Sequence, residues 1–409
     1  MPLRIGYGWI VMGALWTSNL FVVFTGFTLG ILLPDIRTEF GLNPTEAGLL
    51  GSAFFFGFAA FSLPSSILVS RYSPRFVILL ALAGSTVFLF VQGWAPVFWV
   101  LLVSRFLFVA LAVSRSAPEM LLIHQWFDSK GATRVLSLNF TVLCIGQTIS
   151  LAAGPSLLAA LGSWHNLYYL FAFGMLGSTI LWYFVARDNP KTATENDEST
   201  NLFAPIRVLM QRRALWWVAT CQVGASIAFA AFMTFWPTFA IETYNFSLSK
   251  SGSLFSLYPI GGILGAFSAG FISERIRRRK PIIWLSGLIL PIAYLSLLIT
   301  SNSIILAIAL FTAGLGAFIV IPIIMTIPFD MKLQPREIAL AIGLIRTFTP
   351  LAATVGPIVV GLIYQLSGSL LLGLLAVVPL PFFMAICGLI IPETSPLRNE
   401  QRTVTTNVP

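Results

Sequence analysis

The chain has 409 residues, of which 57% are hydrophobic and only 10% are charged, and its mean hydropathy is +0.88. Soluble domains carry about 25% charged residues, so this composition excludes a soluble fold and makes lipid the expected solvent. The net charge of +9 would suit an acidic partner such as nucleic acid, but its distribution along the chain indicates membrane topology instead.

Twelve apolar stretches follow one another along the chain. A spanning helix needs roughly 20 mostly apolar residues, and continuous runs predict helices and not a β-barrel. The sequence therefore predicts an all-α polytopic membrane protein with twelve transmembrane helices. In chain order we expect them at 8–33, 45–70, 75–95, 97–121, 135–161, 166–187, 214–241, 250–273, 281–300, 302–328, 337–365 and 368–392.

The basic residues lie mainly in every second gap between these spans. Lys and Arg concentrate on the cytoplasmic side of membrane proteins. The gaps between spans on the opposite side contain, among Lys and Arg residues, only Arg37 and Lys250. We therefore expect an integral protein of the plasma (inner) membrane with both termini in the cytoplasm.

The longest polar stretch, at 187–213, separates six spans from six. It predicts a six-helix bundle at 1–187, a cytoplasmic linker at 188–213, a second six-helix bundle at 214–392 and a cytoplasmic tail at 393–409. We expect a monomer.

The two halves repeat one another. The tetrapeptide at 45–48 matches that at 249–252 with an offset of 204, and the Gly-Pro pair at 154–155 matches that at 356–357 with an offset of 202. Several nearly constant offsets in the same order are typical of secondary transporters, which are built from internal repeats of spans.

The loop after the eighth span, at 270–279, has the pattern Gly, three residues, acid, base, a small gap and two bases. It resembles the signature loop of the major facilitator superfamily, and the copy at 66–75 is degraded, with Ser66 and Ser70 where the family has Gly and an acid. The resemblance implies the fold of that superfamily. It also implies a conformational latch formed by Gly270, Glu274, Arg275 and Arg278, with Arg71 and Arg75 in the first half; alternatively, the basic residues only anchor topology.

Glycine and proline in spans five and eleven resemble part of the superfamily's antiporter motif. Glycine allows close approach of helices, and proline bends a helix. We expect Gly146, Gly154, Pro155, Gly356 and Pro357 at the seam between the moving halves.

Four charges fall inside the predicted membrane segments, where such residues usually face a wet cavity or a partner. Arg105 resembles the superfamily's intramembrane arginine, which implies substrate handling or proton coupling; alternatively, it is a structural arginine bonded to helix carbonyls. Arg115 and Glu119 share a helix face, so they either form an ion pair or carry the coupling proton. Arg346 has no charged counterpart in the repeat, and either binds an anionic substrate or pairs with a carboxylate.

Polar side chains in the middle of spans form a second group of candidates for substrate binding. Asn19 and Gln222 occupy equivalent positions in the two repeats, in the spans that line the central cavity in this superfamily. Tyr258, Asn139 and Gln147 complete this group, and each could instead form a helix–helix hydrogen bond.

These features predict a secondary transporter of a small anion that works by alternating access and is coupled to protons. The alternative is proton-driven efflux of apolar or cationic compounds. A membrane-embedded enzyme is not expected, because His124 and His165 are the only histidines and the sequence has no catalytic cluster. We expect no cofactor, no metal site and no nucleic-acid partner.

Overall fold

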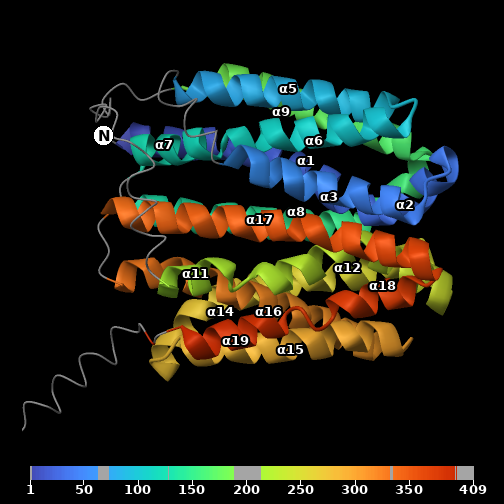
Figure 1. Cartoon of the computed structure of the whole chain (residues 1–409). Helices are drawn as coiled ribbons and strands as arrows, with labels where there is room; N and C mark the ends of the chain where they lie inside the picture. The colour runs from blue at the N-terminus through green and yellow to red at the C-terminus, as the bar shows by residue number, and fades with distance from the viewer. Residues whose placement is uncertain are drawn as a thin grey trace, which may run out of the picture.

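The computed structural model describes residues 2–62, 73–127, 129–187, 213–331, 335–391 and 393, and within these ranges every regular element is an α-helix (Figure 1). The first half contains α1 (Pro2–Phe27), α2 (Leu29–Phe40), α3 (Pro44–Ser62), α5 (Pro74–Trp94), α6 (Phe98–Ser114), α7 (Ser116–Trp126), α8 (Ser129–Leu161) and α9 (Trp164–Val185). The second half contains α11 (Arg213–Thr220), α12 (Val223–Tyr244), α13 (Leu248–Phe255), α14 (Leu257–Ile276), α15 (Lys280–Ile299), α16 (Ser303–Asp330), α17 (Pro335–Ser367), α18 (Leu370–Val377) and α19 (Phe382–Ile390).

The predicted all-α membrane fold is confirmed. Among the described residues, eleven helical segments are long and apolar enough to cross a membrane. Helix α3 is the described part of the remaining predicted span, the second in chain order. The predicted linker at 188–213 lies outside the described residues except for Arg213, and the predicted tail lies outside them except for Glu393.

Several predicted spans are interrupted within their length. The first run divides into α1 and α2 around Thr28, the fourth into α6 and α7 at Arg115, and the seventh into α11 and α12 just before Val223. An interruption releases backbone groups from the helical ladder, and discontinuous helices are typical of the substrate sites of transporters.

The two halves are stacked on one another, with α8 and α17 at their boundary (Figure 1). Helix α17 packs along α3, and α8 packs against α13 and α14. These two contacts are equivalent under the sequence repeat, because α3 corresponds to the α13–α14 span and α8 corresponds to α17. The repeat seen in the sequence is therefore also a pseudo-symmetry of the contacts between the halves.

Contacts between the halves concentrate at one end of the bundle. The N-terminus lies at the other end, at the left in Figure 1, which is called the terminal end below; the end that carries α2 and α18 is called the far end. Near the far end, Ser52 Oγ donates to the carbonyl oxygen of Thr354 at 2.6 Å, and Thr45 Oγ1 donates to Gln365 Oε1 at 2.5 Å. Arg37 lies 3.7 Å from Glu242. The far end is closed by direct polar contact.

Small residues bring the two halves into backbone contact there. A Cβ at Gly48 would overlap the carbonyl oxygen of Pro357, and a Cβ at Gly252 would overlap that of Leu151 and lie 2.8 Å from Pro155 Cγ. Gly48 and Gly252 are equivalent in the repeat, as are Pro155 and Pro357. The same close approach therefore occurs twice, once on each side of the pseudo-axis.

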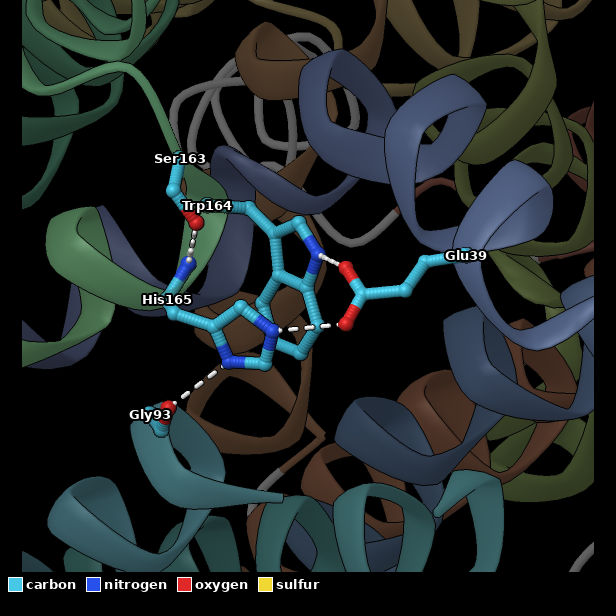
Figure 2. Close-up of polar contacts among 5 residues, drawn as sticks. All are labelled: Glu39, Gly93, Ser163, Trp164 and His165. Atoms are coloured by element: carbon cyan, nitrogen blue, oxygen red, sulfur yellow. Dashed lines mark hydrogen bonds and ion pairs between the residues drawn. The ribbon is translucent and has the colours of Figure 1, made fainter. Parts of the chain in front are cut away.

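A polar cluster at the far end attaches α2 to α9 (Figure 2). The Glu39 carboxylate accepts from Trp164 Nε1 at 2.6 Å and lies 2.8 Å from His165 Nε2, while His165 Nδ1 lies 2.8 Å from the carbonyl oxygen of Gly93. The rings of Trp164 and His165 stack at 3.7 Å. Since α2 also carries Arg37, this cluster fixes the helix that forms part of the contact between the halves.

Candidate functional site

A cavity of about 430 Å³ lies between the two halves. Its walls come from α1, α3, α6, α7 and α8 of the first half and from α12, α14, α16 and α17 of the second. A volume of this size is typical of small-molecule sites. Most of the lining is apolar, and the charged side chains that line it are Arg115 and Glu119.

Arg115 lies at the break between α6 and α7, buried beside the cavity. Its Nε donates to the carbonyl oxygen of Ala112 at 2.9 Å and one terminal nitrogen donates to Ser18 Oγ at 2.6 Å. The other terminal nitrogen donates to Asn19 Oδ1. A guanidinium has five N–H donors, so two of them, one on each terminal nitrogen, remain available to a ligand.

Two asparagines connect Arg115 to Glu119. Asn19 Nδ2 donates to Asn139 Oδ1 at 3.2 Å, and Asn139 Nδ2 donates to Glu119 Oε1 at 2.7 Å. The predicted direct ion pair is wrong, because these two described side chains form no contact within salt-bridge distance. The backbone N–H of Glu119 donates to the carbonyl oxygen of Arg115 at 2.9 Å, so the two residues share one helical turn, but their side chains bind Ser18, Asn19 and Asn139 and not each other. The network places Asn19, Asn139, Arg115 and Glu119, four of the predicted site residues, on one wall of the cavity.

The remaining polar candidates also line the cavity. Gln222 Nε2 lies 3.5 Å from the carbonyl oxygen of Ala317, and the Tyr258 hydroxyl lies 3.4 Å from that of Tyr294. Gln147 Oε1 is buried and has no hydrogen-bond partner in the described part of the chain. The five uncharged side chains chosen from the sequence are thus brought together around one space.

Arg105 is fully buried but does not line this cavity. It donates to the carbonyl oxygens of Thr25 at 3.2 Å and Gly26 at 3.1 Å, beside the break between α1 and α2. Its guanidinium also lies 5.7 Å from the centre of the Phe54 ring. The geometry matches the structural alternative, an arginine bonded to helix carbonyls, and does not bring Arg105 to the candidate site.

Arg346 lies outside the cavity lining, with its side chain exposed. It stands three and four residues before Thr349 and Pro350, which line the cavity, so it shares their face of α17 one turn closer to the terminal end. Arg346 is close enough to Glu119 to interact with its charge. Glu119 belongs to the opposite half, so this electrostatic interaction acts between the two halves.

The latch candidates that the structure describes do not line the cavity. Arg71 is outside the described residues, and the side chain of Glu274 is outside the part whose placement is described. Arg75 Nη2 donates to the carbonyl oxygen of Tyr183 at 3.0 Å, while Arg275 and Arg278 are exposed. A Cβ at Gly270 would meet open space, so glycine is not required there in this conformation.

The predicted seam residues divide into two groups. Pro155 and Pro357 contact the opposite half at Gly252 and Gly48, whereas a Cβ at Gly146, Gly154 or Gly356 would first meet residues of its own half. The two glycines at the half–half contact, Gly48 and Gly252, were present in the repeat but were not selected as seam residues.

Sequence reasoning missed Ser18 and the phenylalanines of the cavity, whereas it selected Tyr258. Ser18 gives no signal beyond its proximity to Asn19. The sequence contains no signal that distinguishes the cavity phenylalanines, because the chain has 35 Phe residues and their positions look alike in sequence. Within the described residues there is no group of three His, Cys, Asp or Glu side chains that could hold a metal ion.

The comparison with known proteins agrees with this architecture. The family model of the Major Facilitator Superfamily matches residues 15–332. A crystal structure of a bacterial homolog to the human lysosomal transporter Spinster has the same fold, with a TM-score of 0.75 and 15% identity over 94% of this chain and 95% of that chain.

Two curated relatives are named for the transport of acids. The hexuronate transporter of Bacillus subtilis is 23% identical over 260 residues, which cover 61% of this chain and 61% of that protein, so this chain spans less than two thirds of that relative. The probable sulfoacetate transporter SauU of Cupriavidus necator is 22% identical over 398 residues, 90% of each chain.

Eleven candidate membrane spans among the described residues, arranged in two repeats around a central cavity, are consistent with the family whose model matches the chain. This chain belongs to the Major Facilitator Superfamily, since the family model covers more than half of its length.

Proposed function

We propose that this protein is a secondary transporter of a small organic anion, coupled to protons and working by alternating access. The observation that carries the proposal is the network from Arg115 through Asn19 and Asn139 to Glu119 on the wall of the central cavity. It joins one buried cation to one buried carboxylate without direct contact between them.

Arg115 is the candidate anion-binding group. Two of its N–H groups have no partner in the described part of the chain, and a planar guanidinium binds a carboxylate through parallel hydrogen bonds. The contacts to Ala112, Ser18 and Asn19 hold its position before a ligand arrives. Arg346, one turn toward the terminal end, adds a second positive charge on the route into the cavity.

Glu119 is the candidate proton carrier. An anion bound at Arg115 is repelled by the Glu119 carboxylate in the same apolar cavity, because charges interact strongly where water is scarce. A proton on Glu119 removes that repulsion, so proton and anion favour each other's binding. This linkage is reciprocal, as required of any two coupled ligands.

The described conformation has the far end closed, and the basic residues favour the terminal end as the cytoplasmic side. On that assignment the contacts between the halves close the cavity on the side away from the cytoplasm. Alternating access then requires the contacts at Gly48 and Gly252 to part while the terminal ends of the halves come together. The hexuronate and sulfoacetate specificities of the two relatives support an acidic substrate.

The test is transport by purified protein in proteoliposomes. With an imposed pH gradient, labelled organic anions should accumulate in the wild type, and Arg115→Gln should reduce this uptake at least tenfold. Glu119→Gln should abolish accumulation driven by the pH gradient while retaining anion exchange. Arg134→Gln, at an exposed arginine near the start of α8, serves as the matched control and should behave as wild type.

The alternative function, proton-driven efflux of apolar or cationic compounds, gives the opposite pattern. Anion transport that survives Arg115→Gln, together with cation transport lost in Glu119→Gln, would replace the anion proposal by efflux.

A further inference from the structure

The central cavity has two chemically different ends. Asn19 and Asn139 belong to the polar network, and Phe27 and Gln147 lie eight residues farther along α1 and α8 respectively. At 1.5 Å per residue, eight residues correspond to about 12 Å along a helix. Because both helices start at the terminal end, the charged network lies toward that end and Phe27 lies toward the far end.

Six aromatic residues form a continuous wall that is called the aromatic wall here. Phe229 is central to it: its ring stacks on Tyr258 at 5.1 Å with an interplanar angle of 22°, and lies 6.3 Å from Phe27 and 6.4 Å from Phe55. Phe54 contacts Phe27 and Phe55, and Phe318 meets Tyr258 at 6.0 Å. All six rings line the cavity, and they come from both halves.

The wall presents ring surface and not polar atoms. The Tyr258 hydroxyl points to Tyr294, so this residue offers its ring to the cavity. Arg105 stands behind Phe54, with its donors directed to the carbonyl oxygens of Thr25 and Gly26. The arginine thus supports the wall without adding an exposed charge to it.

The lining of the cavity is mostly apolar, and four of its polar side chains are already hydrogen-bonded within the protein. Ser226 donates to the carbonyl oxygen of Gln222 at 2.8 Å, and Thr349 donates to that of Ile345 at 2.9 Å. The amides of Asn19 and Asn139 are used in the charged network. Gln147 Oε1 is the buried side-chain oxygen of the lining left without a partner among the described residues. A ligand with many hydroxyl groups would leave most of them without hydrogen bonds.

We propose that the substrate is an aromatic or otherwise ring-bearing apolar carboxylate, held with its carboxylate at Arg115 and its ring against Phe229 and the aromatic wall. The inference rests on the proposed anion transport and narrows its substrate class. The proposed substrate class differs from that of a relative named for hexuronate. Hexuronate is a sugar acid, and its hydroxyl groups need hydrogen-bond partners that this cavity does not offer.

The dimensions agree with such a ligand. A cavity of about 150 Å³ is enough to hold benzene, so about 430 Å³ accommodates a carboxylate carrying one or two rings. Offset stacking and edge contacts between aromatic rings at 4.5–7 Å contribute beyond the burial of their area, and the wall offers both geometries.

The test measures binding to the purified full chain with benzoate, 2-naphthoate, glucuronate and benzyl alcohol. We expect the two aromatic carboxylates to bind at least tenfold more tightly than glucuronate, the polyhydroxylated anion, and than benzyl alcohol, the uncharged ring. Phe229→Leu keeps an apolar side chain in the packed wall but removes the ring. It should weaken the binding of 2-naphthoate at least fivefold while changing the affinity for glucuronate less than twofold. Phe271→Leu, on an exposed face of α14, is the matched control and should change neither.

The outcomes separate the two proposals. Tighter binding of glucuronate than of benzoate, with the loss of both in Arg115→Gln, would overturn the aromatic specificity and leave anion transport intact. Equal binding of benzyl alcohol and benzoate, unaffected by Arg115→Gln, would overturn the anion site itself. If Phe229→Leu unfolds the protein, the order of the four affinities in the wild type still decides the inference.

Discussion

Arg105 and Arg115 are both buried arginines in the same membrane segment, yet their surroundings give them different roles. Arg105 directs its terminal nitrogens to carbonyl oxygens of α1, and Arg115 contacts side chains and borders the cavity. A charge in a membrane segment signals a partner or a site. The direction of the N–H groups of each arginine shows whether it pairs with the protein or borders the site.

For Arg105 we expect a structural effect. Arg105→Lys keeps the charge but cannot reach Thr25 and Gly26 together, because an ammonium lacks the fork of the guanidinium. Thermal unfolding in detergent should show a loss of about 1–3 kcal/mol, since buried acceptors lose their donor. The substrate affinity of the folded protein should change less than threefold, and a tenfold loss of affinity with unchanged stability would assign Arg105 to the substrate instead.

At the scale of elements, the interruptions of the spans matter more than their lengths. The break after Phe27 provides the acceptors for Arg105, and the break at Arg115 turns that side chain toward Ser18 and Asn19. Helix α2, separated from α1 by the first break, is attached to α9 by Glu39 and to the other half by Arg37. Short independent helices thus carry the contacts that a continuous span could not make.

The attachment of α2 should depend on pH. Partial burial alone would raise the pKa of the Glu39 carboxyl, but the hydrogen bonds from His165 and Trp164 and the charge of His165 outweigh it, so the pKa lies below its ordinary value. A carboxyl with a lowered pKa in the folded state stabilises the protein above its ordinary pKa, and this stabilisation is lost as the pH falls through the lowered value.

We therefore expect Glu39→Gln to lower Tm by about 1–3 °C at pH 7, because a half-exposed contact of this kind is worth little. The difference in Tm from the wild type should stay constant down to about pH 5 and shrink at more acidic pH, as wild-type Glu39 becomes protonated. Thermal unfolding of the detergent-solubilised protein across pH 3–8 measures it. A difference that grows on acidification would contradict the assigned direction.

At the scale of the whole molecule, the two halves meet through paired, symmetric close contacts at the far end. Gly48 against Pro357 and Gly252 against Leu151 and Pro155 leave no space for a side chain. Packed interfaces of this kind have discrete arrangements and do not deform continuously, so a methyl group there shifts the balance between states.

We expect Gly48→Ala to disfavour closure of the far end and to raise the population of the opposite, far-end-open state. Spin labels at Lys250 and Glu46, which lie on the two halves near the far end, should show a longer mean distance in the variant than in the wild type. Gly13→Ala is the control, because a Cβ at Gly13 meets open space, and it should leave the distance distribution unchanged. An unchanged distribution in Gly48→Ala would show that this contact does not govern closure.

The sequence by itself determined the number and kind of the spans, the two-fold repeat and the set of polar residues that surround the central cavity. These properties follow from local composition: a segment of about 20 apolar residues must satisfy its backbone bonds within a helix, and isolated polar side chains in such helices turn toward one another. Asn19, Asn139, Gln222 and Tyr258 could be selected for that reason alone.

Only the tertiary structure decided which intramembrane charges reach the cavity and which rings line it. Arg105 and Arg115 look alike in sequence, and the spacing of Arg115 and Glu119 predicts an ion pair, whereas in the structure Asn19 and Asn139 connect the two side chains. Phe229 is one of 35 phenylalanines and is distinguished only by its neighbours from the other half. The physical reason is that side-chain direction at an interruption, and contact across two halves distant in the chain, are set by packing and not by local pattern.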